Sequence, residues 1–189
     1  MRVIAGTHRG RRLRAPRGTG TRPTSDRVRE AAFSILGDCT GACVVDIFAG
    51  SGAMGIEALS RGAALAVFIE RDAEAIECIR HNLATLGFER SGRVVPRDWS
   101  AALAGLRSSD TRFDICVIDP PYALFPGISD EIGPGLAPIL SEYATVMLEG
   151  PAQGPVPTLD GVRVTERTDR TYGSTRVSIL RAYTQGEVE

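Results

Sequence analysis

Short apolar runs alternate with amphipathic segments along most of the chain. Five runs of strand length end at or beside a charged, glycine or proline residue, and they cover residues 43–49, 64–69, 94–96, 113–118 and 144–149. Between several of them, apolar residues recur every three or four positions, which is the spacing of a helix with one buried face. Two last runs, 162–168 and 175–182, flank a turn and predict an antiparallel hairpin. This order predicts an α/β fold with a doubly wound, mostly parallel, seven-stranded sheet and one antiparallel strand.

Helix boundaries follow from the apolar spacing and from residues that cap helix ends. A first helix ends at Leu36 and turns Val28, Ala32 and Ile35 toward the core. Another begins after Asp72, whose carboxylate suits the first turn of a helix. Both helices are therefore expected to pack one apolar face against the sheet.

Residues 123–138 are rich in glycine and proline and predict a loop with an interrupted helix. A segment of this kind suits a lid over a bound substrate. A passive connector explains the same composition equally well.

Charge is unevenly distributed although the net charge is only −1. Residues 1–30 hold nine arginines and two carboxylates, whereas the remainder holds thirteen arginines and twenty-one carboxylates. Residues 1–23 are therefore interpreted as a basic arm or small β-hairpin, and 24–189 as one domain with a full core. A basic arm on an acidic domain suggests a polyanionic partner, although a solvated leader is the alternative. The arginines expected to contact phosphates are Arg9, Arg11, Arg12, Arg14, Arg22 and Arg27.

Composition argues against a membrane protein and against a metal site. No apolar run approaches membrane-spanning length, and the first residues do not form a signal peptide, so a cytoplasmic protein is expected. The four cysteines lack the paired short spacings of a zinc site, so no metal is expected. Cys43 and Cys116 lie in apolar runs and are expected to be buried, reduced thiols.

A glycine-rich segment, residues 50–55 (GSGAMG), follows the strand at 43–49 and precedes a helix. Glycine lets the backbone turn tightly and approach a ligand, and a helix start offers free N–H groups. Glu70 ends the next strand, twenty residues after Gly50, where a carboxylate can accept both ribose hydroxyls of an adenosine. A nicotinamide dinucleotide fits this pattern, but Asp46 within the strand and the lack of a second nucleotide-binding half favour S-adenosylmethionine.

The strand at 113–118 delivers Asp119, Pro120, Pro121 and Tyr122 to the edge of the sheet. The two prolines restrict the backbone, so this loop is stiff enough to hold a flat substrate. An exocyclic amine on a nucleobase is a poor nucleophile, and acceptors on its N–H groups favour its reactive form. Asp119 and the Pro120 carbonyl are candidate acceptors, and Tyr122 can stack on the base. An ordinary Pro-Pro turn is the alternative.

Asp119 to Tyr122 resemble the signature of amino-directed, S-adenosylmethionine-dependent methyltransferases, which modify adenine N6 or guanine N2. In addition, 6–11 (GTHRGR) and 21–30 (TRPTSDRVRE) resemble the amino-terminal signature of the bacterial RsmD family. Members of that family methylate guanine N2 in small-subunit (16S) ribosomal RNA. The resemblance spans the chain and implies a Rossmann-like class I methyltransferase domain over 24–189, acting on ribosomal RNA in the small subunit or its assembly intermediate.

The resemblance also implies roles for individual residues. Asp119, Pro120, Pro121 and Tyr122 would be catalytic. Asp98 would accept from the adenine amino group, and the Trp99 backbone would complete the pocket, although Asp98 also suits a helix N-cap. The residues expected at S-adenosylmethionine, or at its product S-adenosylhomocysteine, are Asp46, Phe48, Ala49, Gly50, Ser51, Gly52, Gly55, Glu70, Arg71, Asp98 and Trp99.

Three other functions explain part of the sequence. An adenine-N6 methyltransferase acting on RNA or DNA would use the same 119–122 signature. A nicotinamide-dependent oxidoreductase explains the glycine-rich segment and Glu70 but leaves Asp119 and the basic arm without a role. A non-catalytic RNA-binding module explains only the arm.

Overall fold

A seven-stranded sheet forms the centre of the protein. The structure is a computed structural model that describes residues 1–17, 26–121, 124–153 and 158–184. Its strands are β1 (Cys43–Ile47), β2 (Leu65–Glu70), β3 (Gly92–Pro96), β4 (Phe113–Ile118), β5 (Leu140–Pro151), β6 (Arg163–Tyr172) and β7 (Thr175–Tyr183). They lie in the order β3-β2-β1-β4-β5-β7-β6. The first five in that order are parallel, and β7 runs antiparallel to both of its neighbours, so the predicted topology is confirmed.

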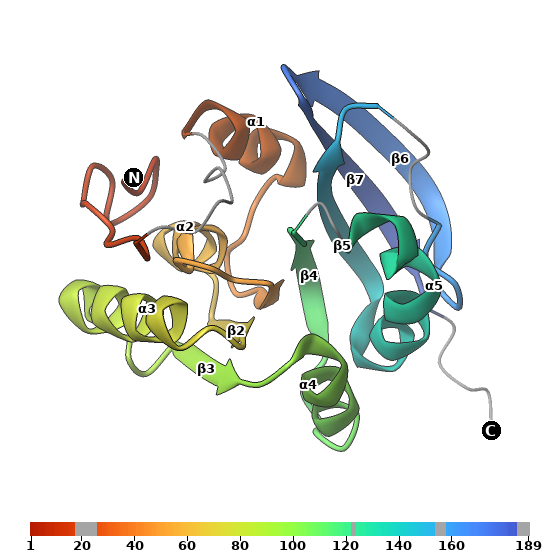
Figure 1. Cartoon of the computed structure of the whole chain (residues 1–189), viewed down its shortest axis with the longest axis horizontal. Helices are drawn as coiled ribbons and strands as arrows, with labels where there is room; N and C mark the ends of the chain where they lie inside the picture. The colour runs from red at the N-terminus through yellow and green to blue at the C-terminus, as the bar shows by residue number, and fades with distance from the viewer. Residues whose placement is uncertain (18–25, 122–123, 154–157, 185–189) are drawn as a thin grey trace.

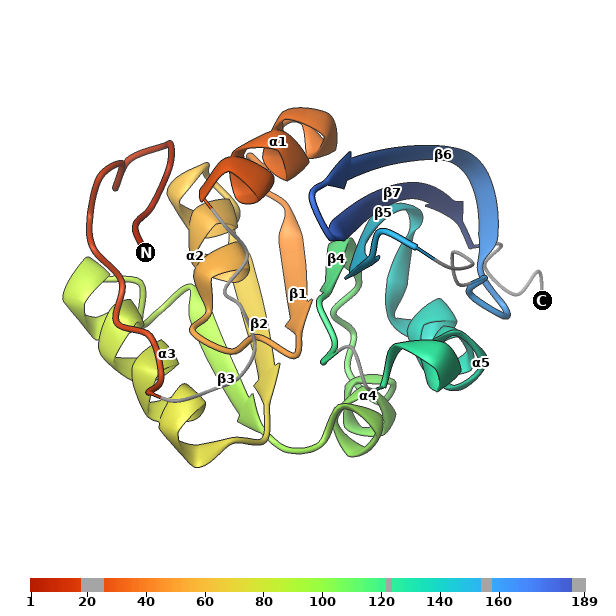
Figure 2. The same cartoon turned by 45° about the horizontal axis from the view of Figure 1, so that its top comes forward.

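Helices cover both faces of the sheet (Figures 1 and 2). They are α1 (Asp26–Leu36), α2 (Ala53–Ser60), α3 (Ala73–Leu86), α4 (Trp99–Leu106) and α5 (Phe125–Leu136), followed by a short 3-10 turn, Ala137–Ile139. The buried apolar side chains form two clusters, one under α1, α2 and α3 and the other under α4 and α5. Each face of the sheet therefore has its own core, as a doubly wound fold requires.

Capping residues begin two of these helices where the sequence predicts. The Asp72 carboxylate accepts from the Ala75 N–H at 2.9 Å and starts α3. The Asp98 carboxylate accepts from the Ser100 N–H at 3.1 Å and starts α4. Each carboxylate satisfies an amide of the first turn that has no partner within the helix.

The segment predicted as a loop with an interrupted helix is instead the helix α5. Phe125, Ile128, Ile132 and Leu136 are buried at steps of three and four, so one face of α5 is anchored in the core. Pro134 lies near the end of the helix, where the loss of one N–H donor breaks only one hydrogen bond. The density of glycine and proline in the sequence conceals this apolar spacing.

Burial differs from the expectation at three positions. Cys43 is half-buried rather than buried, because it is the first residue of β1, at the amino end of this central strand, whereas Cys116 is buried as predicted. Ile35 is also only half-buried, and Phe33 takes its place in the core. Arg29, on the same helix, is completely buried, and apolar spacing gives no sign of this.

The N-terminal residues form a short hairpin that packs against α2 and α3 (Figure 2). Arg2 and Arg12 make an antiparallel bridge, and Val3 and Leu13 are buried in the same core as α1 to α3. Gly6 has a φ of 80°, and a Cβ on it would lie 1.8 Å from the Ser60 carbonyl oxygen, so only glycine fits this contact.

Buried polar side chains of the domain hold the hairpin in place. The Glu57 carboxylate accepts from the N–H groups of Ile4 (2.7 Å) and Ala5 (3.0 Å) and from Arg61 Nε (2.8 Å). Arg29 Nε lies 3.8 Å from the same carboxylate. Both the Glu57 and the Arg29 side chain are 0% exposed, so the two charges are compensated inside the protein rather than by water.

Replacing Glu57 by alanine should lower the free energy of unfolding by about 3–5 kcal/mol, because the Arg29 charge would stay buried without this partner. Urea denaturation measures the change. Glu77→Ala is the matched control, since Glu77 is 65% exposed and pairs only with Arg80 at the surface; it should change stability by less than about 1 kcal/mol. Equal effects of the two substitutions would contradict a structural role for the buried carboxylate.

Candidate active site

The carboxyl ends of the parallel strands open into a cleft of about 1100 Å³. Its walls come from the loop after β1, the ends of β2, β4 and β5, the start of α1 and the turn between β6 and β7. In open α/β sheets, ligands bind at this edge, outside the carboxyl ends of the strands. Nine of the predicted cofactor residues line the cleft: Asp46, Phe48, Ala49, Gly50, Ser51, Glu70, Arg71, Asp98 and Trp99.

The loop after β1 reverses direction through left-handed backbone conformations. Gly50 has a φ of 55° and Gly52 a φ of 77°, which glycine adopts without steric cost. Phe48 also has a positive φ, 64°, which is uncommon for a residue with a side chain. The surrounding structure must hold it there, and backbone strain of this kind is concentrated at functional sites.

Two predicted cofactor residues, Gly52 and Gly55, support the loop from behind instead of lining the cleft. A Cβ on Gly55 would lie 2.4 Å from the Phe68 ring, and one on Gly52 would lie 3.2 Å from Ile79. The Gly55 N–H donates to the Asp46 carboxylate at 2.9 Å. These glycines let α2 pack closely on the sheet, so their role in the cofactor site is indirect.

Glu70 connects the loop after β1 to the end of β2. Its carboxylate accepts from the N–H groups of Gly50 (2.8 Å), Arg71 (2.8 Å) and Asp72 (2.9 Å). A carboxylate has about four lone-pair positions, so it can still accept from a ligand hydroxyl. Glu70 is thereby fixed in orientation while it faces the cleft.

Asp98 and Trp99 line the cleft beside the end of β2. Arg71 donates to Asp98 at 3.4 Å, and the Trp99 ring lies 6.3 Å from the Phe48 ring, measured between centroids. Asp98 lines the cleft and also caps α4. Its expected roles as a helix cap and as an acceptor for the adenine amine are therefore compatible. An aromatic wall beside hydrogen-bonding carboxylates suits a flat, polar ring such as adenine.

Asp119, Pro120 and Pro121 lie in the same cleft, next to the loop after β1. Asp119 is half-buried, Pro120 is buried and Pro121 is exposed. The Asp119 N–H is 3.4 Å from the Ile47 carbonyl, which joins the ends of β4 and β1. The fourth predicted catalytic residue, Tyr122, lies outside the described residues.

Three carboxylates approach one another where these elements meet. Burial, together with the negative charges of Asp119 and Glu70, raises the pKa of Asp46 to about 8, whereas the hydrogen bond from Gly55 opposes the shift. The charges of Asp119 and Glu70 make this part of the cleft favourable for a cation and unfavourable for a phosphate. The Asp46 carboxylate also occupies an N–H group of α2, a group that a pyrophosphate would otherwise use.

The predicted RNA-binding arginines divide between the hairpin and the cleft. Arg9, Arg11, Arg12 and Arg14 are exposed on the hairpin side of the molecule. Arg27, at the start of α1, lines the cleft. The sixth, Arg22, lies outside the described residues.

One end of the cleft consists of residues that the sequence patterns do not predict as site residues. Glu149 on β5 and residues 171–175 around the β6–β7 turn contribute to its lining. Glu149 follows an apolar strand run just as Glu70 and Asp119 do, and that signal could have identified it. The turn gives no comparable signal, because only the pairing of β7 with β5 brings it to this edge.

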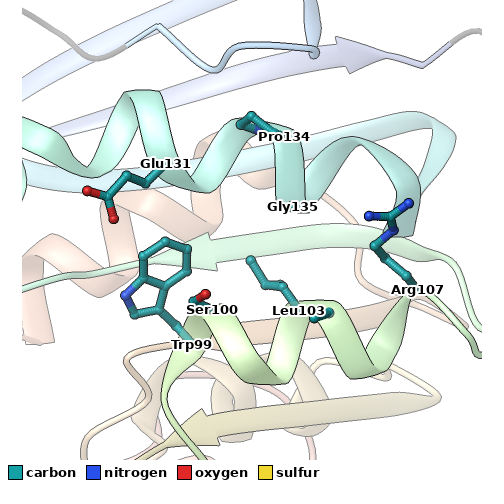
Figure 3. Close-up of a pocket in the computed structure, with 8 residues that line it drawn as sticks. Trp99, Ser100, Leu103, Arg107, Glu131, Pro134 and Gly135 are labelled. Atoms are coloured by element: carbon teal, nitrogen blue, oxygen red, sulfur yellow. The ribbon is translucent and has the colours of Figure 1, made fainter.

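A second, smaller hollow of about 200 Å³ lies between α4 and α5 (Figure 3). The Trp99 ring extends toward α5 and lines both this hollow and the cleft. Its other walls include Leu103 of α4 and Pro134 of α5, and it contains none of the other predicted site residues. Packing against α5 therefore restrains the ring that faces the cleft.

The sheet order and the site at its carboxyl edge define a class I S-adenosylmethionine-dependent methyltransferase fold. The solved structure of the Escherichia coli protein yhhF, described as a methyltransferase, matches 98% of this chain and 99% of its own, with a TM-score of 0.81 and 34% identity. SMU.776, described as a methyltransferase complexed with S-adenosylhomocysteine, shares the fold at a TM-score of 0.67 and 14% identity, over 82% of this chain and 48% of its own.

The family model described as conserved hypothetical protein 95 matches residues 1–181. The chain belongs to this family, the RsmD family, so the predicted resemblance is confirmed. YlbH of Bacillus subtilis, named as an rRNA methyltransferase, is 36% identical over 188 residues, which cover 96% of this chain and 98% of YlbH. Ribosomal RNA small subunit methyltransferase D of Escherichia coli is 45% identical over 123 residues, 65% of this chain and 60% of that protein.

The described residues contain neither a membrane-spanning helix nor a cluster of metal ligands. Within 1–17, 26–121, 124–153 and 158–184, no helix is long and apolar enough to cross a membrane. Over the same ranges, no three or more His, Cys, Asp or Glu side chains are grouped so that they could hold a metal ion.

The raised pKa of Asp46 predicts a pH dependence of stability. The ordinary pKa of an aspartate is 3.8, and that of Asp46 in the folded protein is about 8. Between these two pH values, Asp46 keeps a proton in the folded state that it has lost in the unfolded state. Asp46 should therefore lower the free energy of unfolding by about 1.4 kcal/mol per pH unit as the pH rises through this window, and have no further effect above it. Asp46→Asn keeps an acceptor for Gly55 and removes the titration.

Urea denaturation of both proteins from pH 4 to 9 tests this dependence. The wild-type curve should fall relative to that of Asp46→Asn up to about pH 8 and then run parallel to it. Parallel curves over the whole range would show that Asp46 titrates normally in the folded protein.

Proposed function

We propose that this protein transfers the methyl group of S-adenosyl-L-methionine to the exocyclic N2 amine of one guanine in small-subunit (16S) ribosomal RNA. The observation that carries the proposal is that Asp119 and Pro120 line the same cleft as the cofactor residues. A base held by Asp119 and Pro120 would therefore meet a methyl donor held by the cofactor residues. The substrate would be the small ribosomal subunit or its assembly intermediate, in the cytoplasm.

The cleft fits S-adenosylmethionine better than a dinucleotide. Glu70 would accept from a ribose hydroxyl, Asp98 from the adenine amine, and Phe48 and Trp99 would flank the ring. The sulfonium is a cation and suits the charged carboxylates of Glu70 and Asp119, which would repel a pyrophosphate. This difference in charge favours the methyl donor over nicotinamide cofactors.

The residues at the end of β4 would activate and orient the amine. When bound, the sulfonium supplies an electrophilic methyl group. Asp119 and the Pro120 carbonyl would accept the two N–H groups of guanine N2 and turn its lone pair toward that methyl. As charge develops on the nitrogen, both hydrogen bonds strengthen, and the Asp119 carboxylate takes up the proton that the amine releases.

Ribosomal RNA is supported as the substrate by the relatives and by the hairpin. The YlbH protein and the Escherichia coli protein are both named as rRNA methyltransferases, the second of the small subunit. In this chain, exposed arginines on the N-terminal hairpin provide cations for phosphates beside an acidic cleft. A free nucleotide has too few phosphates to use them.

Nucleoside mass spectrometry is the direct test of the proposal. Ribosomal RNA from cells without this protein should lack one N2-methylguanosine, and purified enzyme should restore it in vitro. Asp119→Ala should bind the cofactor normally but turn over at least about a hundredfold more slowly, because its contact strengthens in the transition state. Loss of N6-methyladenosine instead, with N2-methylguanosine intact, would assign the enzyme to adenine.

Glu70→Ala should weaken S-adenosylmethionine binding by roughly 1–3 kcal/mol, the cost of losing hydrogen bonds to a charged acceptor. Calorimetry on the folded variant measures the affinity. Glu77→Ala, an exposed carboxylate on α3, is the control and should bind normally. Unchanged affinity in Glu70→Ala would remove this residue from the cofactor site.

Replacing Arg11 and Arg12 together by alanine should weaken RNA binding and flatten its salt dependence. Each lost phosphate contact reduces the log–log slope by roughly 0.7–0.9. Because both side chains are exposed, the hairpin should stay folded. Arg107 and Arg112 are exposed on the other side of the domain, and the same double substitution there is the charge-matched control. Equal slopes for the two double variants would mean that the hairpin does not contact phosphates.

A further inference from the structure

The cleft extends beyond Asp119 to a second carboxylate, Glu149, which neither the cofactor site nor the amine-binding pair uses. Glu149 is 6% exposed, yet it lines the cleft. Ile118 of β4 pairs with Leu148 of β5 in parallel register, so Asp119 and Glu149 are the next residues on adjoining strands. The two carboxylates therefore enter the cleft side by side from the carboxyl edge of the sheet.

Both side chains belong to the face of the sheet that α1 covers. Val117 and Met147, two residues before Asp119 and Glu149, are buried in the core under α1 to α3. Side chains two residues apart on a strand share a face, so Glu149 faces the same side as Met147. Val28 of α1 lines this end of the cleft, as does the β6–β7 turn. Glu149 is thus in a part of the cleft that lies past the amine-binding residues, away from Glu70 and Asp98.

A base whose exocyclic amine reaches Asp119 can place its Watson–Crick edge in this part of the cleft. In guanine, the atom next to the N2 amine on the Watson–Crick edge is N1, which carries a hydrogen and is a donor. In adenine, N1 next to the N6 amine has only a lone pair and is an acceptor. A carboxylate at this position would accept from guanine N1–H and repel adenine N1.

We infer that Glu149 is the residue that selects guanine, by accepting the N1–H while Asp119 and Pro120 hold the N2 amine. This inference rests on the proposed guanine-N2 activity. It explains how the enzyme would choose guanine over adenine. The 119–122 signature alone cannot distinguish the two purines, because both present an sp² amine beside a ring nitrogen. Glu149 responds to that ring nitrogen, because a carboxylate accepts from an N–H group and repels a lone pair.

RNA that carries 2-aminopurine at the target position provides the test. Once the guanosine methylated by the wild-type enzyme has been mapped, 2-aminopurine is placed there; it keeps the exocyclic 2-amine but has no hydrogen on N1. Transfer of radiolabelled methyl groups gives kcat/KM for each RNA. The wild-type enzyme should prefer guanine by at least about tenfold, the scale of one good base contact. Comparable rates on the two RNAs would overturn the inference without any variant.

Glu149→Gln tests the residue itself. An amide is a weaker acceptor for guanine N1–H, and its NH₂ group can donate to N1 of 2-aminopurine. The guanine preference should therefore fall at least about tenfold, while S-adenosylmethionine affinity and thermal unfolding stay as in the wild type. Glu149→Asp keeps the charge and should keep the preference, even where the rate is lower. A purely structural role would instead lower activity on both RNAs equally and leave their ratio unchanged.

Glu142→Gln is the matched control, because Glu142 is an exposed carboxylate near the start of the same strand. It should leave the ratio of the two rates unchanged. An unchanged ratio in Glu149→Gln as well would overturn the inference, and if that variant does not fold, the wild-type comparison with 2-aminopurine decides. Failure of the proposed function is a separate result, since the wild-type enzyme would then methylate no guanine N2 in the RNA that carries guanine at the target position.

Discussion

One buried carboxylate, Glu57, connects the segments on which both ends of the cleft depend. It accepts two backbone N–H groups of the N-terminal hairpin and pairs with the buried Arg29 and the half-buried Arg61. The helix that carries it, α2, begins at the glycine-rich loop. Because an uncompensated charge in the core is costly, these contacts form together or not at all. The arginine-bearing hairpin and the loop after β1 are therefore positioned by the same helix.

A second buried side chain makes this connection direct. Asn82 of α3 exchanges hydrogen bonds with the backbone of Arg14, at 2.8 and 2.9 Å, and donates to the Ser51 carbonyl at 3.0 Å. Ser51 belongs to the cleft wall, and Arg14 is one of the exposed arginines. The hairpin and the loop after β1 are therefore joined to each other through one buried amide.

Local patterns in the sequence predict the sheet, most helices and the carboxyl edge, because each depends on near neighbours in the chain. Asp72 and Asp98 cap their helices through amides two or three residues away. Long-range contacts are what the patterns miss. Arg29 is buried beside Glu57, which comes from a distant part of the chain, as well as beside the nearby Asp26. Glu149 reaches the cleft because β5 pairs beside β4. Gly55 was assigned to the cofactor although its contact is with Phe68, since a glycine motif does not distinguish ligand contact from close packing.

The opposite charges of the hairpin and the cleft restrict what can enter the site. Phosphates are attracted to the exposed arginines, but the carboxylates of Glu70 and Asp119 repel them from the cleft. A nucleotide can satisfy both regions only if its base enters while its phosphate stays outside. That arrangement requires the base to leave its stack, which costs least for an unpaired nucleotide. Charge alone therefore favours a flipped or loop base in a large folded RNA over a base within a continuous helix.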